Sequence, residues 1–322
     1  MQIRPVLILS LLLASSVSLS GQHADLSFQL RTSASYTTLD GDRYRPQTGF
    51  GGERLSMKLN VELSDKFYFS WFQNFNKPIS SADPFNATDW ITLEYRPNDR
   101  WSFVAGKLVP AFGGWEYWIP AITVYMPGEY WMYTPFFQFG AGAEYSFVNG
   151  RDHLSFQLTR SPWCPVGRND VLAAHLLWVG DHDWFHGRCS LNALGTGDGP
   201  ELHSYLGGKF MFGKSTLELD LIMREGGYCG YHDSYSTVAN YYYTLSDSLV
   251  LMAKETTDGF SGGSLTKFGA GAEYYPIKDS RSLRFYALGY TTFGSTSSFG
   301  ITPARLTCFS AGILIMQNIF KK

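Results

Sequence analysis

The chain has 322 residues, with 26 basic and 28 acidic side chains, and this near balance argues against a nucleic-acid-binding protein, which needs a clustered basic surface. Only 17% of the residues are charged, whereas 24 Phe, 20 Tyr, 9 Trp and 33 Gly are dispersed along the chain. This composition is typical of a protein with one face in lipid and another in water.

The first twenty residues have the pattern of a secretory signal peptide. Arg4 precedes a mostly apolar run over 6–14, and Ser18 and Ser20 supply small residues at the −3 and −1 positions of a cleavage site. The apolar run is too short to span about 30 Å of hydrocarbon, and no later run approaches the ~18 apolar residues of a membrane helix. The sequence therefore predicts a signal peptide over 1–20 and an exported domain over 21–322.

Alternation of apolar and polar residues with a period of two recurs along the exported domain. It is clear over 55–63, 185–193 and 217–223. Successive side chains of a β-strand point to opposite faces, so each such segment has one apolar and one polar face.

Short polar turns and longer connections alternate between these segments. The short turns are predicted at 64–65, 97–99, 149–150, 181–183, 213–214, 246–247 and 278–279. The longer connections are predicted near 39–51, 77–86, 110–133, 161–168, 197–201, 227–232, 257–263 and 294–304. Fifteen connections join sixteen strands, so the predicted fold is all-β, a transmembrane up-and-down antiparallel β-barrel of about 16 strands. The alternative is a soluble β-sandwich or propeller, which does not account for the alternation of short and long connections.

The heptapeptide FGAGAEY occurs twice, over 139–145 and 268–274. Neither copy completes a G-x-G-x-x-G nucleotide-binding pattern, and no helix signal follows either one. In the sixteen-strand count the copies lie on the sixth and the fourteenth strand, both running toward a tight turn. We expect the phenylalanines and tyrosines to face outward, with the glycines leaving space inside for a folded-in loop or a bulky side chain.

The longest predicted connection, 110–133, contains eight aromatic residues and only two charged ones, Glu116 and Glu129. A connection of this length inside a compact domain needs a functional explanation. We expect it to fold into the barrel as a constriction, and the alternative is aromatic packing on the outer rim. The candidate constriction residues are Lys107, Phe112, Trp115, Glu116, Trp118, Glu129 and Trp131.

The segment WSFVAGKLVPAFGGWEYW over 101–118, with the preceding DWITLEYRPNDR, resembles the phosphate-selective porin O and P family. The matching residues are Gly106, Lys107 and the run 110–113. The resemblance implies an outer-membrane porin of a Gram-negative bacterium, a homotrimer that passes small hydrophilic solutes or ions. Phosphate selectivity does not follow, because the third long connection contains no Lys or Arg to bind phosphate.

Charged residues of both signs are expected on the inner wall, which predicts weak ion selectivity. The candidates are Arg54, Lys58, Glu62, Glu94, Arg96, Glu144, Arg188, Lys209, Glu218, Asp220, Arg224, Lys267, Glu273 and Arg284. For each one the alternative is a solvated structural role. At a constriction the field is focused, so Glu116 and Glu129 are the stronger candidates for selectivity.

Other functions find less support in the sequence. No histidine groups with a serine in a recognisable motif, so we expect neither an enzyme nor a cofactor. A barrel with a plugged lumen, structural or secretion-associated, remains an alternative because a plug and a constriction have the same sequence pattern. The four cysteines lack metal-ligand spacing, and Cys164 and Cys229 fall in connections on the same side, where a disulfide can form.

Overall fold

The structure is a computed structural model of the whole chain, and it describes residues 23–78, 84–164, 168–197, 199–225, 234–260, 262–295 and 301–321. The predicted signal peptide and the predicted connection 227–232 lie outside the described residues, as does Cys229 of the predicted disulfide. Cys164, Cys189 and Cys308 are free cysteines.

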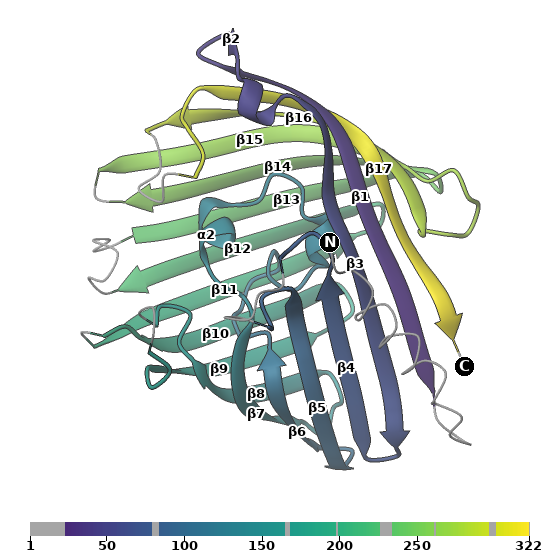
Figure 1. Ribbon diagram of the computed structural model, residues 1–322, viewed down its shortest axis with the longest axis vertical. Coiled ribbons are helices and arrows are strands. Elements are labelled where there is room, and N and C mark those ends of the chain that lie inside the picture. Colours follow the sequence, from purple (N-terminus) through teal and green to yellow (C-terminus); the bar gives the residue numbers. More distant parts are fainter. Residues whose placement is uncertain are drawn as a thin grey trace.

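Most of the described chain is β-strand (Figure 1). The strands are β1 (Ala24–Leu39), β2 (Asp42–Arg43), β3 (Gly49–Ser64), β4 (Phe67–Asn74), β5 (Thr88–Asn98), β6 (Trp101–Leu108), β7 (Gln138–Ser146), β8 (Asp152–Arg160), β9 (Leu172–Asp181), β10 (Phe185–Gly195), β11 (Pro200–Phe212), β12 (Ser215–Glu225), β13 (Ser234–Ser246), β14 (Leu249–Phe260), β15 (Gly263–Tyr274), β16 (Leu283–Gly294) and β17 (Leu306–Lys321). The helices are the 3-10 turns η1 (Arg45–Gln47) and η2 (Ala121–Thr123) and the α-helix α2 (Glu129–Tyr133). In the described part of the chain, no helix is long and apolar enough to cross a membrane.

Sixteen of these strands close into one antiparallel barrel. Each strand pairs with the next along the chain, and β1 pairs with both β17 and β3, which closes the ring. The remaining strand, β2, has two residues and extends the β1–β3 hairpin. The predicted sixteen-strand barrel is therefore confirmed.

Alternation sorts the side chains of each strand between the outer and the inner face. On β11, for example, Leu202 and Leu206 are 46% and 50% exposed on the outer face, whereas His203 and Tyr205 are buried on the inner face. The outer face is mostly Leu, Ala and aromatic residues, because only apolar side chains are stable against lipid.

Tight turns gather at one end of the barrel and longer connections at the other, with the start of β1 and the end of β17 at the tight-turn end (Figure 1). Two connections differ from the prediction. Only 261 and 262 separate β14 from β15, because pairing continues to Phe260 and Gly263, and the turn over 275–282 is longer than expected. Hydrogen-bonded pairing beyond the alternating core of a strand leaves no clear sequence signal.

The two FGAGAEY copies lie at equivalent positions on opposite walls. They occupy β7 and β15, the sixth and fourteenth strands of the ring, eight strands apart. Phe139 and Phe268 are 45% and 51% exposed on the outer face, and Glu273 is buried on the inner face.

Candidate functional site

The connection between β6 and β7, residues 109–137, is called L3 below. It leaves the end of the barrel with the longer connections and folds into the lumen, where η2 and α2 lie inside the ring of strands (Figure 1). L3 contacts the inner face from β9 through β17 to β1, so it covers this side of the lumen.

The first residues of L3 dock on β10 and β11 through glycines. The Gly113 amide donates to Ser190 Oγ at 2.7 Å, and the Gly114 amide donates to the Arg188 carbonyl at 3.0 Å. A Cβ on Gly207 would lie 2.7 Å from Gly114 Cα. The two backbones can approach this closely because Gly207 has no side chain.

Asp220 of β12 binds the next two backbone amides. Its buried carboxylate accepts hydrogen bonds from the Trp115 amide at 2.7 Å and from the Glu116 amide at 3.0 Å. The carboxyl group offers two acceptor oxygens, one for each amide. Asp220, predicted as a wall charge, therefore anchors L3.

The two acidic residues of L3 face the wall. Glu116 pairs with Lys254 of β14, and Glu129 pairs with Lys267 of β15 at 3.6 Å. Glu116 and Glu129 are 2% and 1% exposed, so each carboxylate is withdrawn from the lumen water and neutralised by a lysine. A pairing across more than 130 residues cannot be predicted from L3 alone.

Cations of the wall also bind backbone carbonyls near the middle of L3. Lys254 Nζ donates to the Tyr125 carbonyl at 3.1 Å, and Lys267 Nζ donates to the Pro127 carbonyl at 2.7 Å. Arg31 of β1 donates to the carbonyls of Ile122 at 2.7 Å and Val124 at 3.0 Å. These bonds fix 122–127 against β14, β15 and β1.

A tyrosine hydrogen bond adds to this anchor. Tyr125 donates its hydroxyl to Glu273 at 2.8 Å, and Arg284 pairs with the same carboxylate at 2.8 Å. Burial, and then the charge of Glu273, raise the pKa of Tyr125 well above its usual value. The phenol therefore stays protonated and keeps donating.

Aromatic side chains fill the space between L3 and β9–β12. Phe112 is fully buried and stacks on Tyr205 with ring centroids 5.2 Å apart. The Tyr130 hydroxyl lies 2.7 Å from both His203 Nδ1 and the Tyr205 hydroxyl. Burial raises the pKa of Tyr117, another member of this cluster, well above its usual value. The cluster occupies its side of the lumen with packed side chains.

The other predicted constriction residues are divided between the lumen, the wall and the outer face. Trp118 is 39% exposed toward the lumen, and its indole donates to the Phe112 carbonyl at 2.6 Å. Trp115 is buried against the wall, and Trp131 is half-buried and donates to the Glu116 carbonyl at 3.2 Å.

Lys107 lies on the outer face instead of in the lumen. It has the same parity on β6 as Trp101 and Phe103, which are 42% and 44% exposed outside. Its ammonium donates to the Phe85 carbonyl at 2.8 Å. The alternation of side-chain direction along WSFVAGK indicates that Lys107 faces outward, whereas the family motif alone does not indicate a direction.

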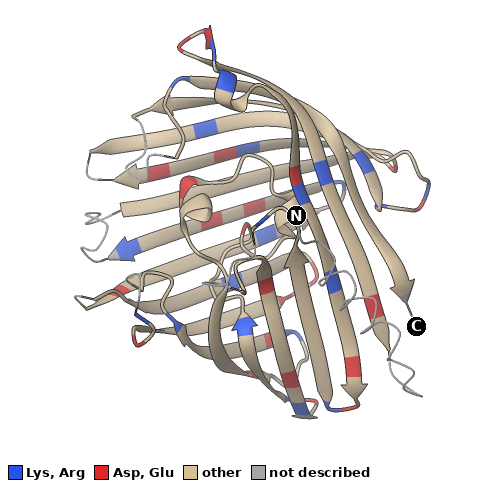
Figure 2. Cartoon of the chain, in the orientation of Figure 1, with Lys and Arg blue, Asp and Glu red and all other residues tan. Residues whose placement is uncertain are grey.

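Figure 2 shows charged residues of both signs on strands around the barrel. Most of the predicted wall charges are paired. Arg96 binds Glu94 at 2.8 Å and Lys209 binds Glu218 at 3.3 Å. Three of the remaining predicted wall residues have these partners: Glu144 accepts from Ser155 at 2.7 Å, Arg224 donates to Ser234 and Ser236 at 3.0 and 2.7 Å, and Arg54 lies 3.8 Å from Asp89. Glu62 lines a pocket together with Glu94 and Arg96.

Two predicted wall cations make no ion pair within the described residues. The Arg188 guanidinium lies over the rings of Trp115 and Trp118, 4.6 and 4.9 Å from their centroids, and Lys58 lies 5.7 Å from the Trp90 ring on β5. β3 and β10 are the second and ninth strands of the ring, so Lys58 and Arg188 face the lumen from nearly opposite walls.

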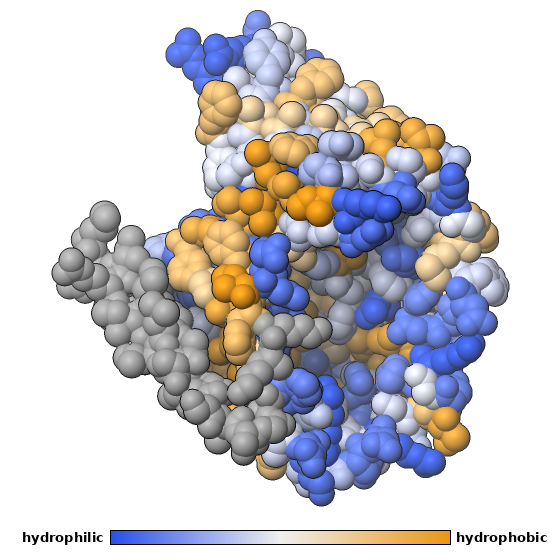
Figure 3. All heavy atoms as spheres, turned by 90° about the vertical axis from the view of Figure 1, so that its right-hand side faces the viewer, coloured by the Kyte–Doolittle hydropathy of each residue, from blue (hydrophilic) through white to orange (hydrophobic). Residues whose placement is uncertain are grey.

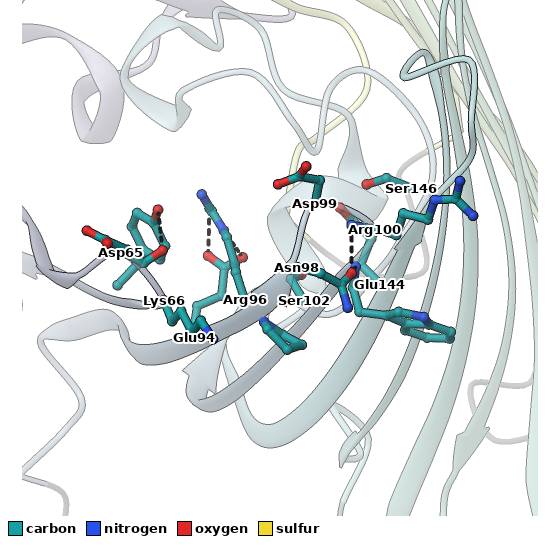
Figure 4. A pocket seen from close by; sticks show the side chains of 13 residues that line it. Asp65, Lys66, Glu94, Arg96, Asn98, Asp99, Arg100, Ser102, Glu144 and Ser146 are labelled. Atoms are coloured by element: carbon teal, nitrogen blue, oxygen red, sulfur yellow. Dashed lines mark hydrogen bonds and ion pairs between the residues drawn. The ribbon is translucent and has the colours of Figure 1, made fainter.

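At the tight-turn end the lumen is hollow and rimmed by hydrophilic side chains (Figure 3). Part of this rim is a pocket of about 540 Å³ (Figure 4). It is lined by charged residues of both signs, including Asp65, Lys66, Glu94, Arg96, Asp99, Arg100 and Glu144. This end of the barrel therefore presents polar groups around its opening.

Among the wall residues that bind L3, Arg31, Lys254 and Asp258 were not predicted from the sequence. Alternation assigns Lys254 and Glu255 to opposite faces of β14, but both are charged, so the pattern does not say which one faces the lumen. The pairing of Lys254 with Glu116 cannot be predicted from the sequence, because the two residues meet only when the barrel closes.

The sequence matches no protein-family model and no curated protein. Several solved structures are similar to it. An anion-selective porin from Comamonas acidovorans is 14% identical over 92% of this chain and 100% of its own, with a TM-score of 0.66. OmpF of Salmonella typhi, in complex with daunomycin, is 11% identical over 91% of this chain and 97% of its own, with a TM-score of 0.68.

A third similar structure is the trimer form of OmpT, an outer membrane protein of Vibrio cholerae. It is 12% identical over 92% of this chain and 99% of its own, with a TM-score of 0.57. At these identities the likeness concerns the fold, and the chain has the sixteen-stranded barrel fold of the porins.

Proposed function

We propose that the protein is an outer-membrane porin, a passive diffusion channel for small hydrophilic solutes that L3 narrows. The observation that carries this proposal is the position of L3, which is fixed to the inner face from β10 round to β1 by buried ion pairs and by hydrogen bonds to its backbone. A loop held to one side narrows the lumen without filling the opposite side, where polar residues of β3–β8 remain. The similar structures include an anion-selective porin, which supports a channel on this fold.

The resemblance to the phosphate-selective porin O and P family supports the same proposal. Its matching segment, 106–113, leads the chain into the lumen and ends in the docking contact of Gly113 with Ser190. L3 contains no Lys, Arg or His, so the proposal does not extend to phosphate selectivity.

We also propose location in the outer membrane of a Gram-negative bacterium and assembly as a homotrimer. The fold supports the location, and the trimer form of one similar structure supports the assembly. Native mass spectrometry of the refolded protein in detergent checks the assembly, and a monomer at all protein concentrations would contradict it.

The test of the channel is the conductance of the refolded protein in planar bilayers. We expect discrete current steps that scale with salt concentration. A barrel that is folded, as judged by heat-modifiable gel mobility, but that gives no steps would contradict the channel and favour a plugged barrel.

A further inference from the structure

We propose that the L3 tip packs against Gly269, inside the second FGAGAEY copy, and that this contact sets how far L3 reaches into the lumen. The tip is defined here as 125–127. The inference rests on the proposed channel function, because its consequence is the size of the open passage.

The tip has a strained backbone that neighbouring groups hold in place. Met126 has a φ of +49° and is 5% exposed. The left-handed region is unfavourable for a non-glycine residue, so other contacts must stabilise it. Lys254 binds the carbonyl before Met126 and Lys267 binds the carbonyl after it, at 3.1 and 2.7 Å.

The Met126 side chain occupies the place of a side chain that Gly269 lacks. A Cβ built on Gly269 would overlap Met126 Sδ. The same Cβ would lie 2.6 Å from the Gly289 carbonyl oxygen and 2.6 Å from Tyr290 Cβ on the neighbouring strand β16. Any larger residue at 269 therefore meets both the neighbouring strand and the loop.

The first FGAGAEY copy supplies a matched control. Gly140 is the same position of the motif on the opposite wall, and a Cβ there would lie 2.5 Å from the Leu158 carbonyl oxygen and 2.8 Å from Thr159 Cα on β8. All three nearest atoms belong to β8 and none to L3. A substitution at Gly140 thus disturbs the neighbouring strand as at Gly269, without touching the loop.

Displacement of the tip can occur in one direction only. The first part of L3 is fixed to β10–β12 through Gly113 and Asp220, and the wall of β15 lies behind the tip. A side chain at 269 therefore moves Met126 off the wall and toward the middle of the lumen. The passage becomes narrower, which lowers both the conductance and the size of the largest solute admitted.

The experiment compares Gly269→Ala with Gly140→Ala by single-channel conductance and by liposome swelling in neutral sugars of increasing size. We expect a smaller step and a lower size limit for Gly269→Ala, with Gly140→Ala unchanged. Met126→Gly removes the thioether and suits the positive φ, so Gly269→Ala/Met126→Gly should return to the wild-type step. Equal loss in both alanine variants, or no rescue by Met126→Gly, would overturn the proposal.

A measurement without current separates this inference from the channel function. In Met126→Cys/Gly269→Cys the two thiols would meet, and mass spectrometry after oxidation detects a disulfide between positions 126 and 269. A disulfide in a barrel that does not conduct would contradict the channel function and support the contact between positions 126 and 269. Absence of the disulfide in a conducting barrel would overturn the proposed role of Gly269 and leave the channel function standing.

Discussion

The ammonium group of Lys267 lies 3.6 Å from the carboxylate of Glu129, and the two side chains are 5% and 1% exposed. The same ammonium donates to the Pro127 carbonyl at 2.7 Å. Lys267 thus compensates the charge of Glu129 and also binds the backbone of L3. Glu129 serves to hold the loop, and its charge does not reach the solute.

Lys267→Met is expected to destabilise the closed position of L3. It leaves Glu129 buried without a cation, which costs about 3–5 kcal/mol when one partner of a buried ion pair is removed. Hydrogen exchange should increase at amides 125–134, and the open-channel current should become noisier. The control is Lys267→Met/Glu129→Gln, which removes both charges and should recover most of the protection. If the double variant exchanges as fast as the single one, the ion pair is not what holds L3.

Asp220→Ala is expected to release the start of L3. The Trp115 and Glu116 amides lose their acceptor, and each buried donor without a partner costs about 1–3 kcal/mol. Exchange at these two amides should increase many-fold. Asp220→Asn keeps one acceptor oxygen and should have a smaller effect. Unchanged exchange in the alanine variant would contradict the anchoring role.

Arg188→Gln is expected to shift ion selectivity away from anions. Arg188 has no ion pair within the described residues, whereas Lys209 on the next strand is paired with Glu218. A unit charge at ~4–8 Å in water is worth about 0.5–1 kcal/mol, or about two- to fivefold in relative permeability. Reversal potentials in a salt gradient measure this ratio. Lys209→Gln serves as the control, and an equal shift in both variants would mean that pairing does not decide selectivity.

Trp118→Ala is expected to widen the passage. The Trp118 indole is 39% exposed toward the lumen, and its removal leaves the anchors of L3 intact. Current steps should become larger and larger sugars should enter liposomes. Phe112→Leu is the contrasting variant, because Phe112 is fully buried behind the loop. It should lower stability and leave the step size unchanged. A Trp118→Ala barrel with wild-type steps would place the narrowest point elsewhere.

Alternation within single segments was enough to predict the barrel. A period of two assigns faces without any partner strand, so alternating segments and their connections predicted sixteen strands and the position of both FGAGAEY copies. The eight aromatic residues of 110–133 favoured this connection as the one that enters the lumen, with packing on the outer rim as the alternative. The outward direction of Lys107 is contained in the parity of 101–107, but Lys107 was predicted at the constriction.

The roles of the charged residues depend on the tertiary structure. Glu116 and Glu129 are the acidic residues of L3, but their partners Lys254 and Lys267 are more than 130 positions away, on strands that meet the loop only after the barrel has closed. The two FGAGAEY copies illustrate the same limit. Gly140 and Gly269 have identical neighbours in the chain, and only Gly269 lies behind Met126, because L3 folds toward β15 and away from β7. Local sequence sets the direction of a side chain, and the closure of the ring decides what it meets.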